Sequence, residues 1–359
     1  MTKQLSIVKS LTHHFRFHIT VMLNLLLSLS VIIQSNNKYS EWIHLGFNST
    51  MNMKVDKLWP CGWWMSANVI TQVVRYEALT GDRSAVPVLS EPFEAAKNDY
   101  EGDFINEFYD DNGWWGHAWY ETFLITGDKK YLNMSKSIFN QMTSGWQEDG
   151  KCGGLLWKRG ATYISAISNG LFNLLGARLY EATGDEFYGK WFKKSINWWF
   201  ESEMYDESQE MVRDGLNDEC GGTGTTYTYN QGMAIGPLIE AYKIFDDKKY
   251  LDRAEKIAQS SMINLIKDGA LSDHNEAESG DGVAFKGPYI RHLGTLYRIT
   301  GKHIYRDFII KNADLILEKD YDSETQSFGV HWYGPFLRKD SSAHACAMEC
   351  LQEAYSILE

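Results

Sequence analysis

A short turn motif recurs five times along the chain and constrains the fold more than any other feature. Each copy follows an apolar segment of helical period with an aromatic residue near its end, and a second amphipathic segment begins directly after it. The motif reads Thr-Gly-Asp or a close variant. It is centred on Gly81, Gly127, Gly184, Asp246 and Gly301, at intervals of about 45 to 60 residues. Because a glycine can end one helix and an aspartate can cap the next, each copy predicts a tight helical hairpin.

A sixth apolar segment, "ACAMECLQEAYSIL", ends the chain without a turn after it. Six such helices predict an all-α fold, an (α/α)6 barrel in which an inner ring of helices is sheathed by an outer set. The helical period excludes a β-propeller, and the unequal spacing with long loops argues against an open solenoid. We expect residues 36–359 to form this single domain.

If the inner helices run parallel, the segments that precede them converge on one face. These segments are rich in glycine, aromatic and polar residues, whereas the turns at the other ends are plain. They read "WPCGWWMSAN", "YDDNGWWGHAW", "CGGLLWKRGATYISAISNG", "CGGTGTTYTYNQG", "SGDGVAFKGPYIRH" and "GVHWYGPFLRKDSSAH". We therefore expect the function to lie on this face.

Charge and composition narrow the class of partner. A formal net charge of −12 argues against binding to nucleic acid or to an anionic membrane surface, which needs clustered Lys and Arg. Aromatic residues make up 14% of the chain, and many stand beside Gly, Asn or Asp. This composition is typical of surfaces on which sugar rings stack while polar neighbours bind hydroxyls.

The N-terminus resembles a targeting segment. Lys3, Lys9 and Arg16 precede a mostly apolar run at 19–33, and a polar stretch follows it. Residues 1–35 are thus predicted to be a signal peptide or an uncleaved signal anchor, and the protein to be secreted or held at the cell surface. Any membrane anchoring is expected through this segment only.

The five cysteines are too few and too scattered for a disulfide framework, and their odd number leaves at least one free. Cys346 and Cys350 are four residues apart but lack further ligands nearby, so a zinc site is not expected. No nucleotide-binding loop, nucleophile elbow or zinc-protease motif is present. The sequence therefore predicts neither a cofactor nor a metal.

Two adjacent carboxylates, Asp110 and Asp111, open the second predicted inner helix. Carboxylates in a first turn gain roughly 0.3–1 kcal/mol from the helix dipole, so capping is one explanation. Catalysis is the other, because glycoside hydrolysis uses two carboxylates that flank one bond. Their proximity would also separate their pKa values, leaving one ionised and one protonated.

Four linked motifs decide how this pair is interpreted. "YDDNGWWGHAWYETFLITGDKKYL", "CGGLLWKRG...YISAISNGLFNLLGARLYEATGD", "VRDGLNDECGGTGTTYTYNQGMAIGPLIEAY" and "DGVAFKGPYIRHL" together resemble glycoside hydrolase family 76. This endo-α-1,6-mannanase family also includes fungal cell-wall transglycosidases. The resemblance runs from about Trp42 to the C-terminus, and it implies an (α/α)6 barrel and a retaining mechanism. Carried over, Asp110 is the nucleophile and Asp111 the general acid/base.

Two positions depart from the family pattern. His117 stands where a small or aliphatic residue is usual, and Gly170 stands where an acidic residue is common. A lone histidine beside aromatics on a helix is more often a hydrogen-bonded core residue than a base or a metal ligand. Neither change touches the aspartate pair.

Further residues at the inner-helix entrances are candidates for substrate binding. For Asp214 the alternative is a simple Asp-Gly turn, for the amides it is bonding to loop backbone, and for each tryptophan doublet we expect one member in the core. Lys286 is placed either against substrate or against a loop carboxylate. The candidates are Asp214, Asn169, Tyr229, Asn230, Gln231, Trp63, Trp64, Trp114, Trp115 and Lys286.

The resemblance to family 76, taken with these residues and the N-terminal segment, implies an exported retaining glycosidase that cleaves α-1,6-mannosidic linkages in mannan or mannan-like glycans. Two alternatives remain: a transglycosidase on α-mannan or glycolipid-anchor-type glycans, in which a sugar hydroxyl replaces water, and a surface protein that binds mannan without cleaving it.

Overall fold

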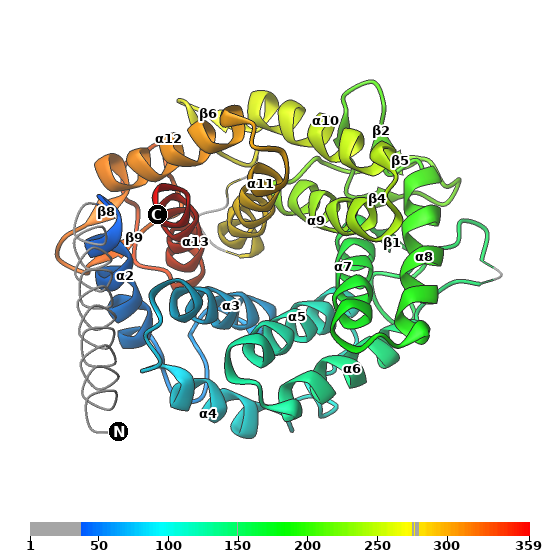
Figure 1. The fold of residues 1–359 in the computed structure, drawn as a ribbon, viewed down its shortest axis with the longest axis horizontal. Helices are drawn as coiled ribbons and strands as arrows, with labels where there is room; N and C mark the ends of the chain where they lie inside the picture. Colours follow the sequence, from blue (N-terminus) through cyan, green and yellow to red (C-terminus); the bar gives the residue numbers. More distant parts are fainter. Residues whose placement is uncertain (1–36, 149, 275, 277–279) are drawn as a thin grey trace, which may run out of the picture.

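Twelve α-helices in the described part of the chain form two concentric rings (Figure 1). The computed structural model describes residues 37–359 except 149, 275 and 277–279, so the predicted targeting segment at 1–35 lies outside the described residues. The inner helices are α3 (Trp63–Thr80), α5 (Tyr109–Thr126), α7 (Ala166–Thr183), α9 (Thr228–Phe245), α11 (Lys286–Thr300) and α13 (Ser341–Leu358). The outer helices are α2 (Ser40–Asn52), α4 (Val86–Ala96), α6 (Lys129–Thr143), α8 (Glu186–Glu201), α10 (Lys248–Asn264) and α12 (His303–Lys319).

Each inner helix packs against the next, and α13 packs against α3, which closes the ring. The predicted (α/α)6 barrel is thereby confirmed. Its hairpins form for the predicted reason, because all five motif positions have the left-handed conformation that ends a helix, with φ from 53° at Asp246 to 72° at Gly81. After three of the turns an aspartate caps the outer helix, as when Asp128 accepts a bond from the Lys130 backbone N–H.

The loops between the helices contain short antiparallel strand pairs. β1 (Ile164–Ser165), β4 (Gly215–Leu216) and β5 (Gly222–Thr223) form a three-stranded sheet in the order β1-β4-β5. The two-stranded pairs are β2 (Tyr205–Asp206) with β3 (Met211–Val212), β6 (Ile266–Lys267) with β7 (Ala270–Leu271), and β8 (Tyr321–Asp322) with β9 (Ser327–Phe328).

Several buried polar side chains of the inner helices pair with one another. Arg291 of α11 bonds Glu349 of α13 through its Nε at 2.8 Å, with both side chains buried. His117 is likewise a core residue, as the sequence predicted: its Nε2 lies 3.0 Å from the Leu171 carbonyl oxygen and its Nδ1 accepts from Arg178. Burial, and then the Arg178 charge, hold the pKa of His117 well below its usual value. Such pairs let the inner helices bury polar side chains at little cost.

Gly170 has a packing role. A Cβ at this position would lie 2.6 Å from the Met233 carbonyl oxygen, so α7 and α9 approach too closely there for any side chain. The departure from the family pattern therefore allows close helix packing at this point.

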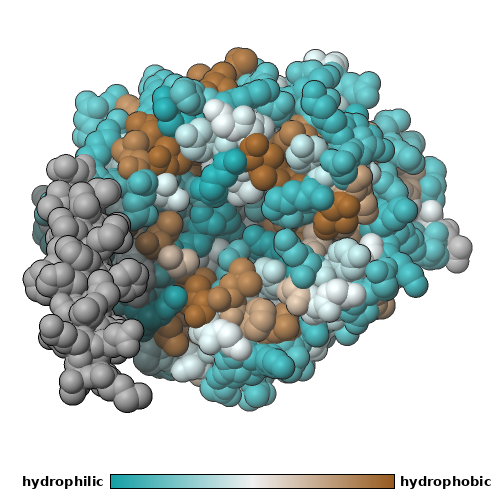
Figure 2. All heavy atoms as spheres, in the orientation of Figure 1, coloured by the Kyte–Doolittle hydropathy of each residue, from teal (hydrophilic) through white to brown (hydrophobic). Residues whose placement is uncertain are grey.

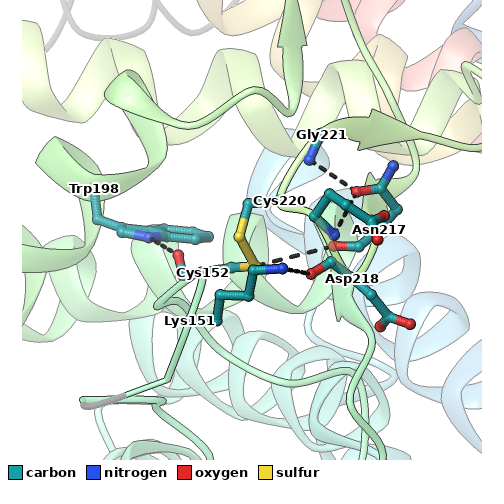
Figure 3. The surroundings of a disulfide bond; sticks show 8 residues. Lys151, Cys152, Trp198, Asn217, Asp218, Cys220 and Gly221 are labelled. Atoms are coloured by element: carbon teal, nitrogen blue, oxygen red, sulfur yellow. Dashed lines mark hydrogen bonds between the residues drawn. A yellow bond between two sulfur atoms is a disulfide. The ribbon is translucent and has the colours of Figure 1, made fainter.

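One disulfide joins Cys152, in the loop ahead of α7, to Cys220 in the turn between β4 and β5 (Figure 3). The sequence did not indicate this pairing. The other cysteines, Cys61, Cys346 and Cys350, are free. Among the described residues, no helix has both the length and the hydropathy needed to cross a membrane. On the face seen in Figure 2, hydrophilic residues predominate and hydrophobic ones occur in small separate groups.

Candidate active site

A pocket of about 320 Å³ lies at the N-terminal ends of the inner helices. The second residue of four inner helices lines it: Trp64 of α3, Asp110 of α5, Ile167 of α7 and Tyr229 of α9. This regularity follows from the parallel inner ring, which brings equivalent positions to one place. The complete lining among the described residues is Trp64, Asp110, Trp114, Trp157, Tyr163, Ser165, Ile167, Asp214, Tyr229, Asp281 and Phe285.

The aspartate pair lies in the first turn of α5, but neither side chain is the N-cap. That position is Phe108, in extended conformation and without a side-chain hydrogen bond. Capping therefore does not account for the pair. Asp110 lines the pocket together with Trp114, which is four residues later on the same face of the helix.

Asp110 is held from across the pocket. The Trp157 indole N–H donates to its Oδ2 at 3.0 Å, whereas Oδ1 is buried without a hydrogen-bond partner among the described residues. Burial, and then the charge of Asp111, raise the pKa of Asp110 well above its usual value.

Asp111, the next residue of α5, does not line this pocket, and a residue of the loop ahead of α5 fixes its position. The Asn106 Nδ2 donates to its Oδ2 at 2.7 Å. Burial is the main cause that raises the pKa of Asp111 to about 6, opposed by the Asn106 bond and assisted by the charge of Asp281. Two adjacent carboxyls with raised pKa values suit a reaction in which one is ionised while the other carries a proton.

Aromatic rings form a wall of the pocket. The ring of Trp64 is stacked near Trp114, with centroids 5.6 Å apart, and Phe285 stacks on Tyr229 at 3.9 Å. The other members of the tryptophan doublets point into the core, where the rings of Trp63 and Trp115 are 4.7 Å apart. Stacked faces of this kind suit the C–H face of a sugar.

Asp214 completes the polar side of the pocket. Its Oδ2 accepts from the Tyr163 hydroxyl at 2.9 Å and its Oδ1 from the Asn230 amide at 2.9 Å. The antiparallel pairing of β1 with β4 brings these segments together, because Ser165 lies opposite Gly215. Asp214 is therefore a fixed acceptor at the pocket wall.

Six of the ten predicted substrate-binding residues do not line the pocket: Asn169, Asn230, Gln231, Lys286, Trp63 and Trp115. Asn169 bonds the backbone of Leu155 at both its amide and its carbonyl, and Gln231 does the same at Val212. Asn230 reaches the site only through Asp214.

Lys286 is a structural residue in this arrangement. It is buried, pairs with Glu276, donates to the Val330 carbonyl and lies 4.7 Å from the centre of the Trp332 ring. Of the two placements open for it, the loop carboxylate is the one observed.

Sequence reasoning did not single out six residues of the lining: Trp157, Tyr163, Ser165, Ile167, Asp281 and Phe285. All six lie in the Gly- and aromatic-rich segments expected to converge on this face. The signal was the composition of those segments, which locates the face but not the individual side chains.

A larger hollow of about 550 Å³ borders Lys267, His274 and Tyr333, but Asp110 does not line it. In the part of the chain that the structure describes, no group of three or more His, Cys, Asp or Glu side chains is arranged to hold a metal ion.

A carboxylate pair at the mouth of an (α/α)6 barrel, beside a wall of aromatic rings, defines the class of glycoside hydrolases. Comparison with known proteins agrees. The model of glycosyl hydrolase family 76 matches residues 36–358, and the chain belongs to this family.

Relatives and solved structures extend this result. The mannan endo-1,6-alpha-mannosidase DCW1 of Candida albicans is 24% identical over an alignment of 264 residues that covers 66% of this chain and 58% of the relative. The chain spans about half the length of the curated relatives it matches. The Lin0763 protein from Listeria innocua has a TM-score of 0.80 at 26% identity, covering 89% of this chain and 97% of its own.

A second solved structure is an inactive variant of the α-1,6-mannanase GH76A of Salegentibacter sp. HEL1_6. Two consecutive aspartates are replaced by asparagine in it, and it is in complex with α-1,6-mannotriose. Its TM-score is 0.81 at 21% identity, over 89% of this chain and 100% of that one.

Proposed function

We propose that the protein is a retaining endo-glycosidase that cleaves α-1,6-mannosidic bonds in mannan or mannan-like glycans. The observation that carries the proposal is the adjacent pair Asp110 and Asp111, both with raised pKa values, of which Asp110 lines a pocket with stacked aromatic rings. Two comparisons support it. The relatives are named mannan endo-1,6-alpha-mannosidases, and the mannanase variant that lacks two consecutive aspartates is inactive.

The reaction would run in two steps. In the first, a carboxylate oxygen of Asp110 attacks the anomeric carbon while Asp111 gives its proton to the departing glycosidic oxygen. In the second, Asp111 takes a proton from water, and the water oxygen displaces Asp110 from the anomeric carbon. The donor bond from Trp157 suits the nucleophile, because an indole N–H can only donate and so favours the ionised carboxylate.

Transglycosylation is the second candidate, and the aromatic wall favours it. Trp64, Trp114, Phe285 and Tyr229 offer apolar faces on which an acceptor sugar could displace water from the second step. Product analysis with and without an added acceptor oligosaccharide separates the two outcomes. A protein that only binds glycans would have no need of two carboxyls held away from solvent.

We also propose that the protein is exported. The Cys152–Cys220 disulfide supports this, since such bonds persist in oxidising compartments. Thiol labelling of the protein taken from its native host tests the idea, and alkylation of both cysteines without prior reduction would contradict it. The targeting segment at 1–35 and any anchoring through it stay predictions.

The activity is tested with Asp110→Asn and Asp111→Asn on linear α-1,6-mannan, with Glu318→Gln, an exposed residue of the outer helix α12, as the control. Each active-site variant should lose at least about a thousandfold in kcat/KM. NMR of the first product should show the α-anomer, whereas release of the β-anomer would exclude the retaining mechanism. Wild-type activity in either variant would overturn the assignment of the pair.

A further inference from the structure

Asp281 is a third carboxylate at this pocket. It is the exposed first residue of the short 3₁₀ helix η1 (Asp281–Ala284), just ahead of α11, and it lines the pocket with Asp110 and Asp214. Among the described lining residues, three are aspartates and none is Lys, Arg or His. The pocket is therefore surrounded by negative charge.

The Tyr229 phenol lies where these charges converge. Burial is the main cause that raises its pKa, followed by the charges of Asp214, Asp110 and Asp281. One cation, the Lys158 ammonium, lies near the outer wall of the pocket, but it is also close to a carboxylate. The Lys158 ammonium is 5.7 Å from the centre of the Trp157 ring and 3.9 Å from the Glu107 carboxylate.

A hydrogen bond fixes the position of Asp281. The Trp64 indole N–H donates to its Oδ1 at 3.0 Å. The Trp64 ring is itself held in the aromatic wall, with centroids 5.6 Å from Trp114 and 6.3 Å from Phe285. The carboxylate is thus kept at the rim of the pocket, although its side chain is exposed.

We propose that Asp281 is a specificity-determining residue that makes the pocket accept neutral and amine-bearing mannosides and reject mannosides that carry a phosphate or carboxylate. This proposal rests on the mannosidase function proposed above. Carboxylates accept hydrogen bonds from hydroxyl and ammonium groups. An anionic substituent would instead lose its water beside carboxylates of the same charge, and such repulsive contacts are a common basis of specificity.

A binding experiment measures, without any catalysis, whether the pocket prefers a cationic sugar to an anionic one. Calorimetry should find that the wild-type protein binds mannosamine at least about tenfold more tightly than mannuronate. Asp281→Asn keeps an acceptor oxygen for Trp64 but removes the charge. It should therefore reduce the ratio of the two affinities, mannosamine over mannuronate, about fivefold. High salt should narrow the wild-type ratio too, because an exposed charge is screened. The control Glu318→Gln should leave it unchanged.

A kinetic experiment tests whether the same charge selectivity applies to an oligosaccharide substrate. Wild-type protein should cleave α-1,6-mannotriose at least about tenfold faster, in kcat/KM, than the same trisaccharide oxidised to a carboxylate at its non-reducing C6. Asp281→Asn should bring the two rates closer, chiefly through the KM of the acidic substrate.

The outcomes separate the two proposals. Equal binding of mannosamine and mannuronate by the wild type, no binding of either, or an Asp281→Asn ratio equal to the wild-type ratio would overturn the role of Asp281. Preference for mannosamine that depends on Asp281, together with no products from α-1,6-mannan, would overturn the mannosidase function and leave the charge selectivity standing.

Discussion

Trp157 donates its indole N–H to the Asp110 carboxylate over 3.0 Å, although the two residues are 47 positions apart in the chain. The bond crosses from the loop ahead of α7 to the first turn of α5, and Trp157 also packs edge-on against Phe108, with ring centroids 5.1 Å apart. One loop side chain therefore contacts both the N-cap residue of α5 and the proposed nucleophile. Through this contact, the position of the loop ahead of α7 affects the pKa of Asp110.

Trp157→Phe should keep the ring packing and lose the bond. Because the bond lowers the pKa of Asp110, its loss should raise that pKa, and the acidic limb of the kcat/KM profile should move to higher pH. We expect kcat/KM to fall by about 10- to 100-fold at the optimum. Trp191→Phe, on the outer helix α8, serves as the control, and a Trp157→Phe profile identical to the wild type would refute the link.

The second prediction concerns Asp111 and the alkaline limb of the kcat/KM profile. As the proposed general acid it must be protonated, and burial raises its pKa to about 6. Because the two adjacent carboxyls both have raised pKa values and titrate together, activity on mannan should fall once the pH rises above the range in which the pair holds one proton. Asp111→Asn should be nearly inactive on mannan but retain activity on aryl α-mannosides whose leaving groups need no protonation. Equal losses on both substrates would argue against the acid role.

Removing the Asp110 charge should stabilise the fold. An unfolded aspartate titrates near about 3.9, whereas burial and Asp111 raise the pKa of the folded Asp110. Stability is therefore lost as the pH rises from about 4 towards the folded pKa, because the ionised form is disfavoured in the folded state. Asp110→Asn should raise Tm by about 2–4 °C at pH 7, and the gain should vanish near pH 4.

Asp206→Asn provides a control of opposite sign. Bonds from Ser208 and then Arg213 lower the pKa of Asp206 to about 2, so its ionised form is favoured in the folded protein. This substitution should lower Tm at pH 7. If both variants shift Tm in the same direction, the electrostatic explanation is wrong.

The tryptophan doublets allow function and packing to be tested separately. Trp114 lines the pocket, whereas Trp115 is fully buried among Trp63, Phe104 and Trp119. Trp115→Ala should cost about 3–5 kcal/mol of stability, as large buried aromatics do. Trp114→Ala should chiefly raise the KM for mannan. Thermal melts and kinetics on the same preparations distinguish the two, and a KM effect confined to Trp115→Ala would contradict the placement.

The ring could be predicted from sequence because its turns follow local rules. A left-handed residue at Gly127 and a cap at Asp128 define a hairpin without any long-range contact. The site could be predicted only in part. Asp110 belongs to a motif on a helix, but Trp157 reaches the pocket from a loop and Asp281 from the short 3₁₀ helix η1, and the positions of both depend on tertiary contacts. Lys286 and Asn169 had the chemistry of ligands, yet burial made their polar groups serve the loops instead.

The disulfide behind the pocket wall gives the last prediction. Cys152 and Cys220 are 68 residues apart, and the bond ties the loop that carries Trp157 and Tyr163 to the turn after Asp214. The Lys151 ammonium donates to the Asp218 carbonyl at 2.7 Å and the Trp198 indole to the Cys152 carbonyl at 2.8 Å, so both sides of the bond are anchored (Figure 3).

The double variant Cys152→Ser/Cys220→Ser should lose about 2–4 kcal/mol of stability, because the unfolded chain is no longer cross-linked. Dithiothreitol should lower the Tm of the wild-type protein by a similar amount. It should leave the double variant unchanged, since the three remaining cysteines are free thiols. Activity near neutral pH should fall mainly through KM, because the wall that holds Asp214 loosens while the turn of α5 that carries Asp110 does not. A reduced protein that melts and binds like the oxidised one would show that the β1–β4 pairing alone holds the wall.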